Sequence, residues 1–150
     1  MNIQKANLAL ADIQSLLAEH LDSASKQDAS HAYSLEQLRA NNFYFFSARN
    51  HKNELMGFAG LLLLNAKHGE IKSVRTHPEH LRKGVSKALM LHLTTFAKQR
   101  NLTRLSLETH PTPAYTAARA MYERLGYKYC DAFADYRNCL LYTSPSPRDS

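Results

Sequence analysis

The most informative stretch of this chain is Leu81-Arg82-Lys83-Gly84-Val85-Ser86-Lys87-Ala88-Leu89. It lies between a predicted strand, residues 70–76, and a predicted helix, residues 85–100, whose apolar side chains recur at helical spacing. A loop that enters a helix presents unpaired backbone N–H groups at the positive end of the helix dipole. Gly84 permits close backbone approach, and the lysines and arginine beside it add positive charge. The stretch predicts a pyrophosphate cradle, and an ordinary helix start with exposed basic side chains is the alternative.

Length and composition indicate one globular domain. The chain has 150 residues and 44% hydrophobic residues, which suffices for a core of its own. Its longest apolar stretch, residues 55–64, is interrupted by Gly57 and Gly60 and is too short to span a membrane. The N-terminus lacks the features of a signal peptide, and two cysteines do not make a disulfide framework. We therefore expect a cytoplasmic protein without a membrane partner, and we expect Cys130 to be a small buried residue.

The charge balance leaves two interpretations. Nineteen Lys and Arg against 13 Asp and Glu give a formal net charge of +6. This charge fits either a nucleic-acid binder or a protein with a local basic site for a phosphorylated cofactor. The basic residues gather in and before the quoted stretch, and no long basic arm or aromatic-basic pattern exists. We therefore expect no nucleic-acid partner.

The rest of the chain predicts a mixture of helices and strands. Strands are expected at residues 3–5, 43–49, 55–64, 70–76, 105–109 and 127–133, with the second and third of them forming a hairpin. Helices are expected near residues 10–21, 34–40, 85–100 and 114–125, the last ended by Gly126. Residues 22–31 are small and polar and predict a loop. No internal repeat is visible.

The C-terminal residues resemble a translated sequencing adapter. Residues 139–149, Cys-Leu-Leu-Tyr-Thr-Ser-Pro-Ser-Pro-Arg-Asp, match what a transposase-library adapter encodes in one reading frame. A natural tail rich in Ser and Pro is the alternative. Our interpretation is a domain of residues 1–138 that is truncated at its C-terminus, followed by a non-native tail at 139–150. An edge strand left unpaired by the truncation would favour a homodimer.

Three segments together resemble the GNAT superfamily of N-acetyltransferases, and the small bacterial acetyltransferases within it. The quoted stretch fits the signature Gln/Arg-x-x-Gly-x-Gly/Ala, with Leu81 and Ser86 as departures. Residues 73–79 are similar to the family's fourth strand and the turn after it. Ala118-x-x-x-Tyr122-Glu123-x-x-Gly126-Tyr127 matches a further signature near the chain end, although Tyr115 stands where many members have Asn.

The resemblance implies a fold, a reaction and a cofactor. The implied fold is α/β, a mixed and mostly antiparallel central sheet of six to seven strands flanked by about four helices. The implied reaction moves an acetyl group from acetyl-CoA to an amine of a small molecule by direct attack in a ternary complex, with no metal. A peptide or protein acetyltransferase and a non-catalytic acetyl-CoA-binding regulatory module are the alternatives. The residues implied to bind acetyl-CoA are Val74, Arg75, Thr76, Arg82, Lys83, Gly84, Val85, Ser86, Lys87 and Ala118, with the backbone N–H of Val74 as oxyanion donor.

Glu70 and Tyr122 are the candidate catalytic residues. Acetyl transfer to an amine needs a base for the amine proton and an acid for the leaving thiolate. Glu70 lies at the spacing before Leu81 where several family members place a base, while an exposed Glu paired with Lys72 is the alternative. His68 or a water molecule could serve instead. Tyr122 matches the family tyrosine that approaches the CoA sulfur, or else it is only a core aromatic.

The acceptor site is defined less sharply. In this fold, His20, the segment from His31, and Glu108 with Thr109 would border the acceptor cleft. Lys72 is expected to share a strand face with Glu70, where a cation would suit a carboxylate-bearing small molecule. The candidate substrate-binding residues are thus His31, Lys72, Glu108 and Thr109.

Overall fold

The computed structural model describes residues 1–26, 40–109, 113–129 and 140–143. Its elements in chain order are β1 (Asn2–Lys5), α1 (Ala11–Lys26), β2 (Phe43–Arg49), β3 (Leu55–Leu63), β4 (His68–Thr76), the short 3-10 helix η1 (Pro78–His80), α3 (Val85–Gln99), β5 (Arg104–Thr109), the 3-10 helix η2 (Pro113–Tyr115), α4 (Thr116–Arg124), β6 (Lys128–Tyr129) and β7 (Leu140–Thr143). The chain divides into two compact units, Met1–Leu61 with Lys72–Leu93, and Leu62–Ile71 with Thr94–Ser150.

The first unit holds β1, β2, β3 as far as Leu61 and the second half of β4, in that order across the sheet. β1 runs antiparallel to β2, from the pair Asn2–Arg49 to the pair Lys5–Phe46. The turn between β2 and β3 is closed by Asn50, whose side-chain oxygen accepts hydrogen bonds from the backbone N–H groups of Lys52 and Glu54 at 3.0 and 2.9 Å. This tight turn reverses the chain, so the aromatic-rich strand β2 and the aliphatic strand β3 become neighbours in the sheet.

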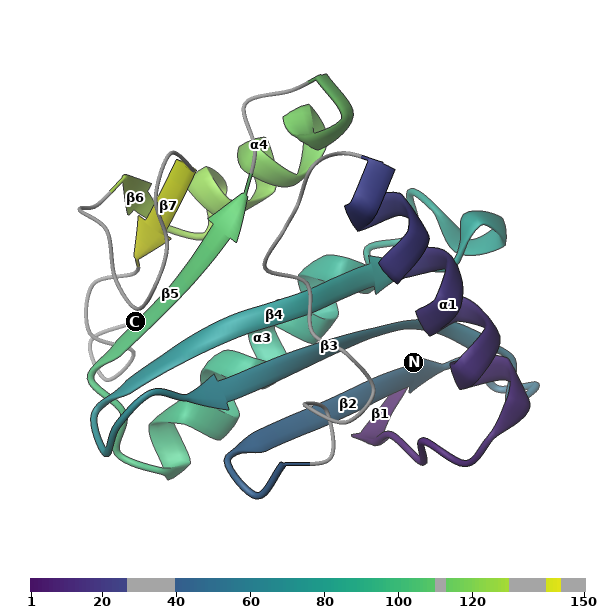
Figure 1. Ribbon diagram of the computed structural model, residues 1–150, viewed down its shortest axis with the longest axis horizontal. Coiled ribbons are helices and arrows are strands. Elements are labelled where there is room, and N and C mark those ends of the chain that lie inside the picture. The colour runs from purple at the N-terminus through teal and green to yellow at the C-terminus, as the bar shows by residue number, and fades with distance from the viewer. Residues whose placement is uncertain (27–39, 110–112, 130–139, 144–150) are drawn as a thin grey trace. The chain divides into compact units, whose positions relative to one another are not determined.

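Helices α1 and α3 cover opposite faces of β3 (Figure 1). The Phe58 ring contacts His20 of α1 edge-on, with the ring centroids 5.8 Å apart. At the preceding residue, a Cβ built on Gly57 would lie 2.5 Å from the Arg75 carbonyl oxygen and 3.0 Å from the Val85 side chain of α3. Successive strand residues face opposite ways, so Gly57 is the residue that lets α3 and β4 approach β3 closely.

The second unit holds the first half of β4, then β5, β7 and β6. β4 and β5 are parallel, from the pair His68–Arg104 to the pair Ile71–Leu107, with α3 in the connection between them. β7 pairs antiparallel with both β5 and β6 and lies between them (Figure 1). The core of this unit is built by apolar residues that are at most 7% exposed, namely Ile71, Ala97, Leu102, Leu105, Leu107, Tyr122 and Tyr127.

The observed architecture agrees with the expected α/β class and mixed sheet. The expectation of six to seven strands is met only in part. Five strands, β1 to β5, follow one another across the sheet in chain order, and only the two short strands β7 and β6 are added after β5. Three α-helices lie in the described residues, and the expected helix at 34–40 falls outside them except for Ala40. Beyond this, the division into residues 1–138 and a tail stays a prediction.

Several expected boundaries are wrong. The loop expected from Asp22 is helical as far as Lys26, because nothing in residues 22–26 is a Gly or Pro that would end α1. The helix expected from Ala114 begins at Thr116, after the 3-10 turn Pro113–Tyr115. The strand expected over residues 127–133 is described only as β6, Lys128–Tyr129, and residues 130–133 lie outside the described chain.

Candidate functional site

The loop before α3 has a backbone suited to holding an anion. Arg82 and Gly84 both have positive φ, 63° and 77°, so two left-handed residues lie within three positions. Backbone of this kind turns successive N–H groups toward one side and forms an anion-binding concavity. The space above Gly84 is open, because a Cβ built there would meet no atom within 4 Å.

The first turn of α3 continues this surface. The carbonyl of Gly84 accepts the first helical hydrogen bond, from Ala88 at 3.0 Å, so the N–H groups before Ala88 have no partner within the helix. Val85 is buried and anchors the turn, whereas the charged side chains of the loop, Arg82, Lys83 and Lys87, are exposed. The Ser86 hydroxyl lies 2.6 Å from the Thr76 hydroxyl, which ties the helix start to the end of β4. A polyanion at this loop would meet backbone donors and positive charge together.

The second half of β4 leads into this loop. Ser73 has a φ of 57°, a left-handed conformation in the middle of a strand that marks a local break in its pleat. Val74, Arg75 and Thr76 follow and are all half-buried. These three residues and the loop of residues 82–87 belong to the first unit, whereas Ala118 of the same predicted cofactor-binding set belongs to the second.

The candidate base Glu70 lies in the second unit and is buried. Its side chain is 1% exposed, which contradicts the alternative of an exposed surface glutamate. Ser106 is its partner across the parallel ladder and is fully buried. The Ser106 hydroxyl is 2.7 Å from Nε2 of His68, two residues before Glu70 on the same strand face. The pKa of His68 is lowered, first by burial and then by the charge of Arg104, which keeps the imidazole neutral at pH 7.

Tyr122 lies on the buried face of α4. Burial, and to a smaller extent Tyr115, raises the pKa of Tyr122 to about 12, so the phenol stays protonated at neutral pH. Its ring packs at 6.1 Å from the ring of Tyr127. Ala118, one turn earlier on the same helix face, is half-buried. These contacts are compatible with both interpretations of Tyr122, since a core aromatic and a proton donor would both be held in this way.

The candidate acceptor residues are divided between the units. Lys72 is half-buried and belongs to the first unit. Glu108 and Thr109 lie on β5 in the second unit, and Thr109 is 3% exposed with a buried hydroxyl that has no hydrogen-bond partner among the described residues. His31 and Cys130 lie outside the described residues.

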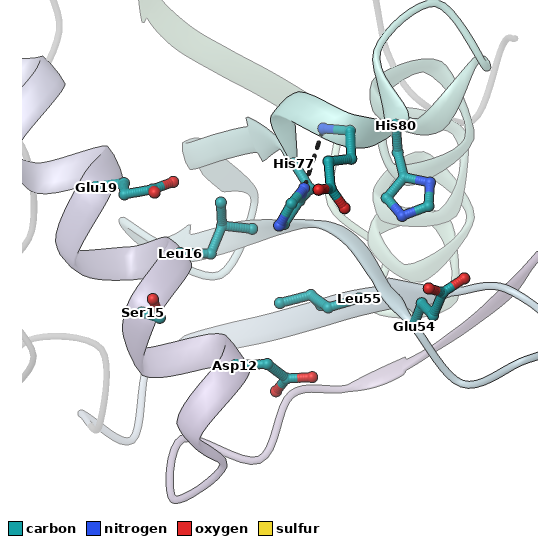
Figure 2. A pocket seen from close by; sticks show the side chains of 9 residues that line it. Asp12, Ser15, Leu16, Glu19, Glu54, Leu55, His77 and His80 are labelled. Atoms are coloured by element: carbon teal, nitrogen blue, oxygen red, sulfur yellow. Dashed lines mark hydrogen bonds between the residues drawn. The ribbon is translucent and has the colours of Figure 1, made fainter.

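A pocket of about 270 Å³ on the first unit was not predicted from the sequence. Figure 2 shows Asp12, Ser15 and Glu19 along one side of α1 and Glu54, His77 and His80 facing them. Nδ1 of His77 accepts a hydrogen bond from the backbone N–H of Glu79 at 3.1 Å. The lining comes from α1, the start of β3 and the segment after β4, so no local sequence pattern could have revealed it. In the described part of the chain, no three His, Cys, Asp or Glu residues are arranged to hold a metal ion, and no helix is long and apolar enough to cross a membrane.

Comparison with known proteins defines the class. The model of the Acetyltransferase (GNAT) family matches residues 10–127. An uncharacterized N-acetyltransferase, YsnE of Bacillus subtilis, is 42% identical over 139 residues, which cover 91% of this chain and 91% of the relative. The crystal structure of a candidate acyl-CoA N-acyltransferase from Klebsiella pneumoniae has a TM-score of 0.80 at 27% identity and covers 96% of each chain. A GNAT family acetyltransferase from Elizabethkingia anophelis, solved with acetyl-CoA bound, has a TM-score of 0.71 at 16% identity, covering 96% of this chain and 97% of that one.

The family model and the curated relatives define the class as acetyltransferase, and the fold agrees with it. The chain belongs to the GNAT acetyltransferase family. This finding confirms the resemblance drawn from the three sequence segments, and with it the expected enzyme class, an acetyl-CoA-dependent N-acetyltransferase.

Proposed function

We propose that the protein transfers the acetyl group of acetyl-CoA to the amine of a small molecule by direct attack. In this proposal, the loop of residues 82–87 holds the pyrophosphate of acetyl-CoA, and β4 from Val74 to Thr76 pairs with its pantetheine arm. Glu70 accepts the proton of the amine, and Tyr122 donates a proton to the departing thiolate. The observation that carries the proposal is the left-handed, exposed and basic loop that opens α3.

The loop suits a pyrophosphate better than it suits a plain helix start. An ordinary start would bring a side-chain cap over the first-turn N–H groups, but position 84 is a glycine and Ser86 is engaged with Thr76. The departures from the family signature at Leu81 and Ser86 leave this backbone intact. Leu81 is 58% exposed, so much of its side chain lies in solvent.

The assignment of Glu70 rests on its burial. Its carboxylate is shielded from bulk water, as a base that acts directly on a bound amine should be. His68 is neutral at pH 7 and is hydrogen-bonded to Ser106, the ladder partner of Glu70. His68 is also less buried than Glu70, so it could carry a proton from Glu70 toward solvent. We therefore assign Glu70 the role of base and give His68 a supporting role.

The assignment of Tyr122 rests on its protonation state. A group that donates a proton must carry one before the reaction, and a pKa of about 12 ensures this across the physiological range. The backbone N–H of Val74 is proposed to stabilise the negative charge that develops on the thioester carbonyl oxygen.

The test is isothermal titration of the protein with acetyl-CoA, repeated with Gly84→Trp. Because the space above Gly84 is open, an indole there occupies the place proposed for the pyrophosphate. We expect saturable binding by the wild-type protein and a loss of at least a hundred-fold in affinity for the variant. Gly126→Trp is the matched control, since Gly126 also has a positive φ, 96°, and open space above it but lies at the end of α4.

Equal affinity of Gly84→Trp and the wild-type protein would contradict the proposed cradle. Absence of binding by a folded wild-type protein would contradict the proposed function itself. Where binding occurs, release of free thiol in the presence of amine panels and peptide panels separates small-molecule acceptors from peptides.

A further inference from the structure

Arg75 is a half-buried cation with no hydrogen-bond or ion-pair partner among the residues that the structure describes. Its Nε is buried and makes no hydrogen bond, and no salt bridge to Arg75 is found in the described part of the chain. Arg49 of the same unit, by contrast, is fully paired: its two terminal nitrogens donate hydrogen bonds to both carboxylate oxygens of Asp12, at 2.7 and 3.0 Å. A guanidinium N–H group that is withdrawn from water without an acceptor is costly, so such a group indicates an anion that the protein binds.

The side chain of Arg75 extends toward α1 and away from α3. Its neighbour Thr76 contacts Ser86 of α3, and alternate strand residues face opposite ways. On the α1 side, the charge of Arg75 acts on His20, whose imidazole also contacts Phe58. Burial first, and Arg75 second, lower the pKa of His20 to about 4, so His20 is neutral at pH 7 and does not repel Arg75.

The chemistry around Arg75 favours a carboxylate. A guanidinium presents a planar fork of donors that matches the two oxygens of a carboxylate. The neutral imidazole of His20 can donate one further hydrogen bond, and Phe58 supplies an apolar wall. Asp12, which could have neutralised a cation in this unit, is already bound to Arg49.

The position on β4 connects this anion site to the reaction. Arg75 directly follows Val74, whose N–H is the proposed oxyanion donor, and consecutive strand residues are about 3.3 Å apart. An anion bound by Arg75 therefore lies within a small molecule's length of the reacting thioester. The acceptor amine is the reactant that must approach the thioester, so an anionic group on the acceptor would reach Arg75.

We propose that Arg75, with His20 beside it, binds a carboxylate of the acceptor, so that the substrates are amino acids or other amines that carry a carboxylate. This inference rests on the proposed function. It moves the expected cation of the acceptor site from Lys72, which has an interaction of its own within the protein, to Arg75.

The experiment compares amino acids and dipeptides with their C-terminal amides as acceptors, using thiol release from acetyl-CoA. We expect the acids to react with a kcat/KM about ten- to a hundred-fold above that of the matched amides, the range for hydrogen bonds to a charged group. Arg75→Gln should remove this preference by raising KM for the acids far more than KM for the matched amides. Arg100→Gln, which neutralises an exposed arginine packed on Phe96, is the matched control and should keep the preference.

A second readout does not depend on turnover. In the wild-type protein saturated with acetyl-CoA, adding the acids should shift the NMR signals of the His20 ring, and adding the amides should not. Because Arg75 has no hydrogen-bond or ion-pair partner among the described residues, Arg75→Gln should not lower the melting temperature.

Equal rates for acids and amides, or an acid preference that survives in Arg75→Gln, would overturn the inference. The inference would also be overturned if every acid tested failed both to react and to shift the His20 signals. The acetyl-CoA titration separates this failure from a failure of the proposed function. If the wild type binds acetyl-CoA and Gly84→Trp does not, the proposed function stands although the inference about Arg75 fails.

Discussion

Glu70 illustrates how much a single residue depends on its surroundings. The side chain is 1% exposed, and the residue facing it across the ladder, Ser106, is hydrogen-bonded to His68. A carboxylate in the sequence shows neither its burial nor its neighbours. Both follow from the register of β4 against β5, which places three polar side chains on one buried strand face.

The proposed role of Glu70 gives a prediction at this scale. Glu70→Gln keeps the size of the side chain and removes the base, so kcat should fall by about a hundred- to ten-thousand-fold, the usual contribution of general base catalysis. The affinity for acetyl-CoA, measured by titration, should stay unchanged. Glu123→Gln, at an exposed position of α4, is the matched control. An active Glu70→Gln variant would direct the search for the base to His68.

At the scale of elements, the ion pair between α1 and β2 is the best-defined link. Arg49 is buried, Asp12 lies at the start of α1 with its side chain 47% exposed, and two hydrogen bonds join them. Arg49 also donates to the backbone carbonyl of Asn53 at 3.0 Å, so it ties α1 to the turn before β3. The pair therefore orients α1, which carries His20 toward Arg75.

This link should make stability depend on pH. Arg49, chiefly through its hydrogen bonds, holds the pKa of Asp12 below its ordinary value of 3.8. The stabilisation is therefore fully present above about pH 5 and is lost as the pH falls through the lowered pKa of the folded protein. Asp12→Asn should cost about 1–2 kcal/mol of unfolding free energy at pH 7, a figure reduced for the exposure of Asp12. Denaturant unfolding at pH 7 and pH 3 checks this, and an equal cost at both pH values would contradict it.

At the scale of the whole molecule, the C-terminal residues complete the sheet. β7, Leu140–Thr143, is part of the stretch that resembles a translated adapter, yet it pairs with β5 from Thr109–Leu140 to Ser106–Thr143 and also with β6. We propose that an apolar, partly β-branched or aromatic tail of this kind can occupy the place of a natural strand, because backbone hydrogen bonds impose little demand on sequence. Without it, β5 would be an unpaired edge.

Removing the tail tests this proposal. Deletion of residues 139–150 should lower the melting temperature and promote association, because β5 and β6 lose the strand between them. Deletion of residues 144–150 alone keeps β7 and serves as the control. Light scattering and thermal unfolding provide the measurements. A monomeric 1–138 protein of unchanged melting temperature would show that β7 contributes nothing to the sheet.

Local patterns predicted most of the elements. β2 coincides with the predicted residues 43–49, and α3 ends one residue before its predicted end. The loop before α3 was also predicted, because a glycine, a helix start and clustered basic residues are all near one another in the chain. These features depend on side-chain periodicity and on turn chemistry, which act over a few residues.

What the sequence by itself determined is thus the family and the order of most of the described elements, together with the glycine-containing basic loop before α3 that we propose as the pyrophosphate site. Only the tertiary structure decided that Glu70 is buried opposite Ser106, that Arg75 near His20 has no ion-pair partner among the described residues, and that a pocket opens along α1. These features join residues from elements far apart in the chain. Their burial and their partners are set by strand register and helix packing, which no short stretch of sequence specifies.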